Sequence, residues 1–368
     1  MGQEWKDKAL EQETNPENLL EHAQWMEGVG DLFSAASFYD RAYGLAPLDE
    51  KIRVARQGVL DKLALVENGL AFRFVPGGPF LMGNDHGEWD ERPLHRAWLS
   101  AFWISETPIS WADYCRLMDW EPPPVGCPRV EGNKAKQDFD EAAFAIYNEN
   151  KIRLQYCEDK TVHARDWHAH APGQLWQSGG KTQTAQELFG SPQRDDPENP
   201  WLYAGKPMVA VSFEGVEMLC RRISTDRIVY SLPTETQWEK AARGGLIAAR
   251  HSWGDAPPTS ERCDFARFDK FSVLPMRTFP PNGYGLYATN GGVWEWTKDW
   301  YQADYYGESP EDNPRGPAEG SERVLRGGSW TDCAEVQTVT FRMSSHHGWA
   351  PNIGFRLCRI PAKLEKQD

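Results

Sequence analysis

In the first part of the chain, residues 1–65, hydrophobic residues recur at helical spacing with few Gly or Pro residues between them. One run of apolar positions three or four residues apart spans residues 32–43, and a second spans residues 52–63. This periodicity predicts two amphipathic helices, with Pro47 and Asp49 closing the first helix and opening the second. Beyond residue 65 the pattern changes, and short hydrophobic runs alternate with Gly, Pro and Asp.

The first of these two helices has the spacing of the second helix of a tetratricopeptide repeat. The matching positions are Ala35, Tyr39, Ala42 and Pro47. The segment before it departs from such a repeat at His22 and Ala23. A single repeat cannot bury its own hydrophobic face, so we expect residues 1–65 to dock on another surface. The alternatives are a brace on the rest of this chain and a repeat-type module that recruits a partner. The short connection to Phe72 favours docking on the same chain.

From residue 70 onward the pattern is typical of an α+β domain with many short strands, few helices and long loops. Strands are predicted at residues 72–83 (two strands joined by a Pro-Gly-Gly turn), 98–104, 324–325 and 354–357. Helices are predicted at residues 111–118, 213–222 and 235–243. Gly244 and Gly245 would cap the last of these. Residues 120–205, rich in Pro and charge, predict a long surface insertion, and residues 363–368 form a tail.

Composition fits a soluble globular protein rather than a disordered chain or a coiled coil. Of the 368 residues 40% are hydrophobic, and the mean hydropathy is −0.65. Lys and Arg number 40 and Asp and Glu 54, which gives a formal net charge of −14. This acidity argues against nucleic acid or an anionic membrane as the main partner. No apolar run approaches the ~18 residues of a membrane span, so no membrane partner is expected.

The seven cysteines are odd in number, scattered and never arranged as Cys-x-x-Cys. This pattern indicates reduced thiols rather than a disulfide framework. The first 30 residues are too acidic for a signal peptide. Together these features predict a cytoplasmic protein.

Nine short motifs between residues 70 and 360 together resemble one family. They are Phe80-Leu-Met-Gly83, Glu91-Arg-Pro93, the segments 207–213 and 232–245, Ser252-Trp-Gly-Asp255, the segment 281–286, Gly292-Val-Trp-Glu-Trp296, the segment 323–330, and Gly354-Phe-Arg356. In this order they resemble the formylglycine-generating enzyme (sulfatase-modifying factor) superfamily. The resemblance implies a C-type-lectin-like fold for residues 66–362.

The copper site of that family is where this sequence departs from the resemblance. In the formylglycine-generating oxidase, two cysteines just after Gly-Gly-Ser-Trp bind Cu(I), in line with the preference of Cu(I) for soft thiolates. In the same register this chain has Asp332 and Gln337, and Cys333 stands alone, one residue away. No copper is therefore expected, and the oxidase activity does not carry over.

Iron is not expected either. Sulfoxide synthases of the same superfamily bind non-haem iron with a histidine motif, His-x-x-x-His-x-Glu, in an N-terminal helical bundle. Residues 1–65 are too short for that bundle and contain only His22.

One histidine group, in the predicted insertion, is the main candidate site for another metal. His163, His168 and His170, together with Asp166, offer imidazole and carboxylate ligands suited to Zn, Fe or Ni. Their place in the predicted surface insertion equally fits solvated polar residues.

Calcium is the one cofactor that the resemblance leaves open. The superfamily binds structural Ca²⁺ partly through an Asn in a Gly-Asn-x-Trp-Glu-Trp turn, and here Gly292 replaces that Asn. Ca²⁺ needs several oxygen ligands, and Glu295, with Asp264 at a second site, could supply them. Trp294 and Trp296 in the same turn are expected to pack in the core.

The first hypothesis for function is a non-catalytic module that binds a protein or peptide partner through C-terminal loops, as related variable proteins do. The candidate contact residues are Thr331, Asp332, Cys333, Ser344, His346, His347 and Trp349. The alternative is a metal-dependent oxidoreductase with a rearranged site that uses His346, His347, Cys333 or Asp332. The missing copper and iron ligands favour the binding module over an enzyme.

Overall fold

The computed structural model describes residues 13–120, 122, 175–178, 181–184, 205–266, 273–346, 350 and 352–361. Several sequence predictions fall outside these residues. They are the metal candidates His163, His168 and His170, the loop residues His347 and Trp349, most of the insertion at 120–205, and the tail at 363–368.

Three helices precede the domain, one more than the periodicity predicts. They are α2 (Pro16–Gly28), α3 (Leu32–Leu45) and α4 (Glu50–Leu63). The residues that precede them are Asn15, Asp31 and Asp49, and each side chain accepts a hydrogen bond from a backbone N–H in the first turn, a group that the helix itself leaves unpaired. The apolar pattern does not reveal α2, because only two of its side chains, Leu19 and Ala23, are buried.

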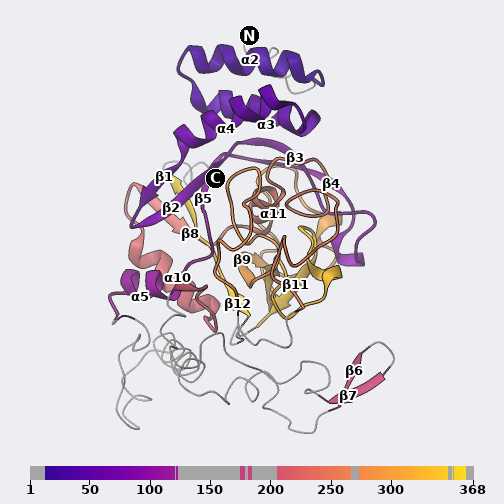
Figure 1. The fold of residues 1–368 in the computed structure, drawn as a ribbon. Helices are drawn as coiled ribbons and strands as arrows, with labels where there is room; N and C mark the ends of the chain where they lie inside the picture. The colour runs from indigo at the N-terminus through magenta and orange to yellow at the C-terminus, as the bar shows by residue number, and fades with distance from the viewer. Residues whose placement is uncertain are drawn as a thin grey trace.

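Two sheets form the domain (Figure 1). The five-stranded sheet has the order β1-β2-β5-β13-β8, and all its neighbouring strands are antiparallel. Its strands are β1 (Leu65–Glu67), β2 (Leu70–Val75), β5 (Phe102–Ser105), β13 (Cys358–Pro361) and β8 (Ile228–Ser231). The last strand of the domain, β13, thus lies between strands from its beginning and its middle.

The four-stranded sheet has the order β11-β10-β9-β12, with β12 parallel to β9 and the other pairs antiparallel. Its strands are β9 (Trp294–Trp300), β10 (Arg323–Arg326), β11 (Arg342–Ser345) and β12 (Ile353–Gly354). Two hairpins complete the described strands: β3 (Gly78–Met82) with β4 (His95–Leu99), and β6 (Leu175–Ser178) with β7 (Lys181–Thr184).

The single strand expected at residues 98–104 is two strands. β4 pairs with β3, whereas β5 belongs to the five-stranded sheet. The chain turns at Ser100, whose N–H donates to the side-chain oxygen of Asn313 at 2.9 Å. A run of apolar residues does not reveal such a change of partner, because Trp98 and Leu99 of β4 continue into the apolar residues of β5 with only Ser100 between them as a polar residue.

The three predicted domain helices are present as α5 (Trp111–Met118), α10 (Phe213–Ile223) and α11 (Glu235–Arg243). Gly244 caps α11 with a left-handed φ of 62°. Short 3-10 turns lie at η1 (Trp89–Glu91), η4 (Tyr305–Gly307) and η5 (Ala334–Val336). With six helices among the described residues and these short strands, the α+β prediction is confirmed.

Tryptophan rings fill much of the domain core. Five of them are at most 1% exposed: Trp111, Trp238, Trp294, Trp296 and Trp330. Each ring removes a large apolar area from water, which holds together loops that have little regular structure of their own. The expected core packing of Trp294 and Trp296 is therefore confirmed.

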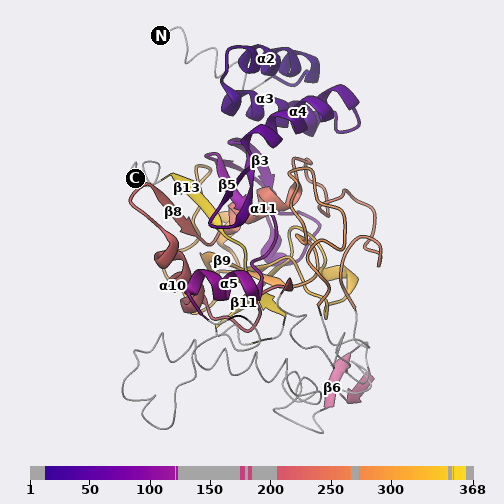
Figure 2. The same ribbon diagram turned by 60° about the vertical axis from the view of Figure 1, so that its left-hand side comes forward.

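The N-terminal helices dock on the domain of the same chain, as the short connection predicts. Figures 1 and 2 show them stacked on the end of the domain opposite to α5. The ring of Phe33 packs edge-on against Phe74 and Trp103, with centroids 5.4 and 5.9 Å apart. The indole N–H of Trp103 donates to the carbonyl oxygen of Leu63 at 2.8 Å.

Arg56 of α4 makes the most extensive of these docking contacts. Its guanidinium is 3% exposed, pairs with Asp40 and lies between the rings of Tyr43 and Tyr284. It also donates to the carbonyl oxygens of Gly283 (2.7 Å) and Gly244 (3.0 Å). Removing it would leave these buried acceptors without a donor, so the helices are a structural part of the domain.

Within the described residues, no helix is long and apolar enough to cross a membrane.

Candidate functional site

The segment that follows β10 begins with a turn that only glycine can make. Gly327 and Gly328 have φ values of 104° and 72°, which lie in the region that L side chains avoid. A side chain at Gly328 would also collide with the amide of Gln337. The turn is fixed from outside by the N–H of Gly291, which donates to the carbonyl oxygen of Gly327 at 2.8 Å.

The two positions of the family's copper cysteines are tied into their own loop. The Asp332 carboxylate accepts from the Ser329 hydroxyl and from the Ser329 N–H, the latter at 2.9 Å. The Gln337 side chain is fully buried, and its amide nitrogen donates to the carbonyl oxygens of Ser329 (3.1 Å) and Cys333 (3.3 Å). Both side chains therefore close the loop that the family uses to hold copper.

A second group of hydroxyls extends this network to β12. The Asn352 amide nitrogen donates to Ser329 Oγ (3.0 Å) and to Thr331 Oγ1 (3.1 Å), and these two hydroxyls are 3.0 Å apart. Burial raises the pKa of Asp332, while the hydrogen bonds from Ser329 oppose that rise. The sequence did not point to Asn352; its place two residues before the Gly354-Phe-Arg356 motif was the available signal.

Of the predicted contact residues in this loop, only Cys333 is exposed. Thr331 is 6% exposed, and Asp332 is half-buried in the network above. Burial raises the pKa of the Cys333 thiol, and its hydrogen bond with Glu335 acts in the same direction. The thiol is therefore protonated at neutral pH, which is the form that binds metal poorly. Glu335 is also exposed.

Ser344 and His346 do not lie beside that loop. Arg326 pairs with Arg342 across the ladder, whereas Arg323 pairs with Ser345. The loop after Arg326 and the end of β11 therefore lie at opposite ends of the ladder, roughly 10 Å apart at ~3.3 Å per residue. Ser344 is half-buried and donates to Glu322, while His346 is exposed with Nδ1 2.7 Å from the Ser321 carbonyl oxygen.

A buried network of charges lies under the loop, and the sequence analysis did not identify it. Arg326 is fully buried and contacts Glu235 (3.1 Å) and Glu239 (2.6 Å) of α11. It also donates to the carbonyl oxygens of Val339 (2.6 Å) and Thr340 (2.9 Å), which follow the loop. Arg342 pairs with Glu235, and Arg243 with Glu239. This network anchors both ends of the segment 327–341 to α11.

The calcium candidates Glu295 and Asp264 have different surroundings. Glu295 is fully buried, and both its oxygens accept from Arg356 at 2.6 and 2.7 Å, with the Trp238 indole N–H as a third donor. This cation already neutralises the carboxylate, so Glu295 does not fit as a calcium ligand. Asp264 accepts from the backbone N–H of Leu274 at 2.9 Å.

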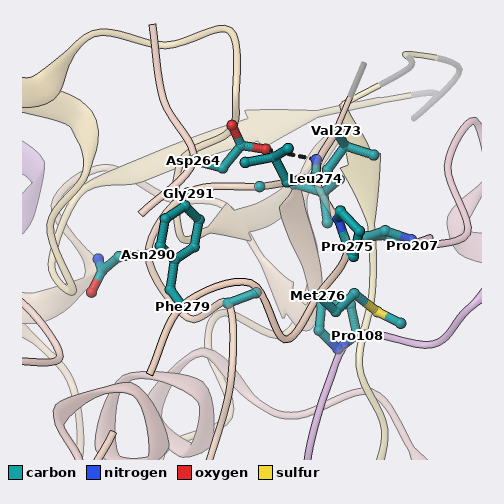
Figure 3. Close-up of a pocket in the computed structure, with 13 residues that line it drawn as sticks. Pro108, Pro207, Asp264, Val273, Leu274, Pro275, Met276, Phe279, Asn290 and Gly291 are labelled. Atoms are coloured by element: carbon teal, nitrogen blue, oxygen red, sulfur yellow. Dashed lines mark hydrogen bonds between the residues drawn. The ribbon is translucent and has the colours of Figure 1, made fainter. Parts of the chain in front are cut away.

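Figure 3 shows the small pocket beside Asp264, which is also lined by Asn290 and Gly291. Its volume of about 10 Å³ is room for about one water molecule. A calcium ion at Asp264 stays a prediction. Among the residues that the structure describes, no group of three or more His, Cys, Asp or Glu side chains is placed to hold a metal ion.

Comparisons with known proteins agree with the motifs. A model of the sulfatase-modifying factor enzyme 1-like domain matches residues 65–361. A formylglycine-generating enzyme of Streptomyces coelicolor is 30% identical over 317 residues, which cover 79% of this chain and 89% of that protein. A mouse protein named inactive C-alpha-formylglycine-generating enzyme 2 is 29% identical over 317 residues, covering 80% of this chain and 87% of that protein.

Among solved structures, PvdO of Pseudomonas aeruginosa matches with a TM-score of 0.53 at 18% identity, over 80% of this chain and 97% of that one. A likeness at this identity concerns the fold alone. The family match covers residues 65–361, and the N-terminal helices precede it. The chain thus belongs to the family of sulfatase-modifying factor enzyme 1-like domains, with the C-type-lectin-like fold that its motifs predict.

Proposed function

We propose that this chain is a non-catalytic binding module on a formylglycine-generating-enzyme-like scaffold, and that it recognises a protein or peptide through its C-terminal loops. The observation that carries the proposal is the closed loop of Ser329, Asp332 and Gln337. The two side chains at the copper positions are a carboxylate and an amide, and both are hydrogen-bonded to the loop itself.

The chemistry of these two groups supports the absence of copper catalysis. Cu(I) prefers soft thiolate ligands, and carboxylate and amide oxygens are hard. Turning Gln337 toward a metal would also leave the carbonyl oxygens of Ser329 and Cys333 without their donor. The mouse relative named as inactive supports the view that this family includes members without the oxidase activity.

The surface available for binding consists of side chains at the two ends of the β10–β11 ladder. Cys333 and Glu335 are exposed at one end, and His346 is exposed at the other. Met343, on the strand between them, is 42% exposed. An acidic group, an apolar group and an imidazole at separate places along this ladder and the loop beyond it suit an extended segment of a partner better than a small molecule.

A metal assay is the first test. The purified chain is incubated with Cu(I) and a thiol-containing peptide in air, and bound metal and oxygen uptake are measured. We expect copper well below one equivalent and no oxygen uptake above the protein-free rate. Stoichiometric copper or iron together with oxygen uptake would overturn the proposal in favour of a metal-dependent oxidoreductase.

A binding selection is the second test. Peptides selected from a random display library on the immobilised chain are measured again on Glu335→Lys and His346→Ala, with Glu21→Lys on the exposed face of α2 as the control. We expect a loss of affinity of about tenfold or more in at least one loop variant and none in the control. A selection without binders, or binders indifferent to both loop substitutions, contradicts the proposal.

A further inference from the structure

A second concave region lies away from the Ser329–Gln337 loop. It is a groove of about 560 Å³ between the ends of the two sheets, within the ~300–1,000 Å³ typical of small-molecule sites. Its lining comes from many elements, among them Phe213 and Glu217 of α10, Lys298 and Trp300 of β9, and Arg323 of β10. No motif in the sequence points to it, because these residues are far apart along the chain.

Arg323 is held in one orientation in this groove. Its guanidinium carbon lies 3.3 Å from the centroid of the Trp300 ring and 4.2 Å from that of Phe213, so aromatic rings are close to it on two sides. Its Nη1 donates to the carbonyl oxygen of Lys298 at 2.7 Å. A fixed guanidinium loses little side-chain entropy when it binds a ligand.

The guanidinium of Arg323 forms no ion pair with the described residues. Its hydrogen bond goes to a neutral carbonyl, its Nε is buried without an acceptor, and none of its other contacts is an ion pair. The remaining nitrogen, Nη2, is neither buried nor bonded to protein. Partial burial lowers the pKa of Arg323 from its usual value, although the nearby charges of Glu217, Asp299 and Glu214 act in the opposite direction.

Lys298 adds a second cation to the same wall. It stands two residues before Trp300 on β9, so the two side chains lie on one face of the sheet. The Lys298 side chain is exposed and, among the described residues, makes no hydrogen bond or ion pair, although its charge interacts with that of Asp299. Two cations without ion pairs, next to each other in a groove of ligand size, favour an anion.

We propose that this groove is a second binding site, for a small organic anion whose carboxylate or phosphate group lies against Nη2 of Arg323 and the ammonium of Lys298. Glu217 of α10 and Asp312 place two carboxylates in the groove, and Arg315 adds a third cation to its lining. The carboxylates disfavour ligands with several anionic groups and suit a ligand that carries a hydroxyl or an amine as well. The site does not depend on the function of the C-terminal loops.

The test uses the full chain and three probes at millimolar concentration: glycolate for carboxylates, inorganic phosphate for phosphates, and uncharged glycolamide. Ionic strength is held constant with chloride. Acetylation of Lys298 by acetic anhydride, followed by mass spectrometry, locates binding, and Lys51 on α4 is the control lysine. We expect glycolate or phosphate to protect Lys298 and not Lys51, and glycolamide to protect neither.

Calorimetry on variants then assigns the contact. We expect about a tenfold or larger loss of affinity in Arg323→Gln and a loss of roughly threefold or more in Lys298→Gln, with none in Lys51→Gln. Because Lys298 is exposed, its variant stays informative even if Arg323→Gln disturbs the fold. Protection of Lys298 by one anion class identifies that class. No protection by either anion, or the same affinity in both groove variants, overturns the proposal.

Discussion

Arg323 and Arg326 stand three residues apart on β10 and have opposite environments. Arg326 is fully buried, and both its terminal nitrogens have acceptors in α11 and in the segment 339–340. Arg323 faces the groove between two rings and has one neutral acceptor. A buried cation paired with carboxylates of its own chain stabilises the fold, whereas one held rigid without an ion pair is available to a ligand. The Asp332 and Gln337 side chains at the copper positions resemble Arg326, because they too are hydrogen-bonded within the fold.

The largest expected effect comes from removing the enclosed arginine. Arg326→Met should lower the free energy of unfolding by about 3–5 kcal/mol, because two carbonyl oxygens and one oxygen of Glu239 lose their donor. Arg323→Met should cost about 1 kcal/mol or less, since only ring contacts and one hydrogen bond are lost. Urea unfolding followed by circular dichroism measures both. Equal losses would remove the distinction between the two arginines.

A pH titration sharpens the comparison of Arg323 with Arg326. Asp299 stands between Lys298 and Trp300 on β9, and it lies between the groove that holds Arg323 and the buried network that holds Arg326. Burial, and then the nearby charge of Glu235, raise the pKa of Asp299 to about 7. The folded state therefore holds a proton that the unfolded state releases near pH 3.8. Stability should fall as pH rises from about 4 to about 7, by up to ~1.4 kcal/mol per pH unit, and then level off.

Asp299→Asn tests this assignment. The variant should lose most of that slope and equal or exceed the parent in stability at pH 8. Thermal unfolding at several pH values provides the measurement, and an unchanged slope in the variant would assign the pH dependence to other groups.

The closed loop should respond to the loss of one amide. Gln337→Met keeps the volume of the side chain and removes both of its hydrogen bonds, so we expect a cost of about 2 kcal/mol. Local opening should follow, and hydrogen exchange of the backbone amides in residues 329–337 should rise relative to those of α11. A neutral result would show that the loop is held by its glycine turn and Trp330 alone.

The smallest effect on stability is expected in the groove. Lys298→Gln changes an exposed side chain that makes no hydrogen bond or ion pair with the described residues, so the free energy of unfolding should stay within about 0.5 kcal/mol of the parent. Chemical denaturation checks this value. A larger loss would mean that Lys298 supports the fold and would weaken the contrast with Arg326.

The sequence predicts much of the fold and little of the site. Helical spacing places α3, α4 and α11 well, because each has an apolar stripe and a capping residue at its start. The alternation of side chains along a strand puts Arg323 and Arg326 on opposite faces of β10, yet it does not say which face is enclosed. That depends on Glu235 and Glu239, which reach the strand only through the tertiary fold.

The copper positions show the same limit. Sequence register identifies Asp332 and Gln337 as the residues in place of the cysteines, and residue chemistry argues against Cu(I). The role that they have instead depends on Ser329 and Asn352, which come together only when β10 and β12 flank β9. Such side-chain networks have no periodicity, so a pattern in the sequence does not reveal them.

The contacts of Arg56 show that the folding unit begins before the family domain does. The family match starts at residue 65, so sequence similarity alone leaves the N-terminal helices outside the domain. The guanidinium of Arg56 crosses that boundary and contacts the carbonyl oxygen of Gly244, the residue that ends α11. The same helix carries Glu235 and Glu239, which fix the base of the loop at the copper positions. Removing these helices would therefore also weaken the support of the loop at the copper positions, so the helices and the family domain form one folding unit.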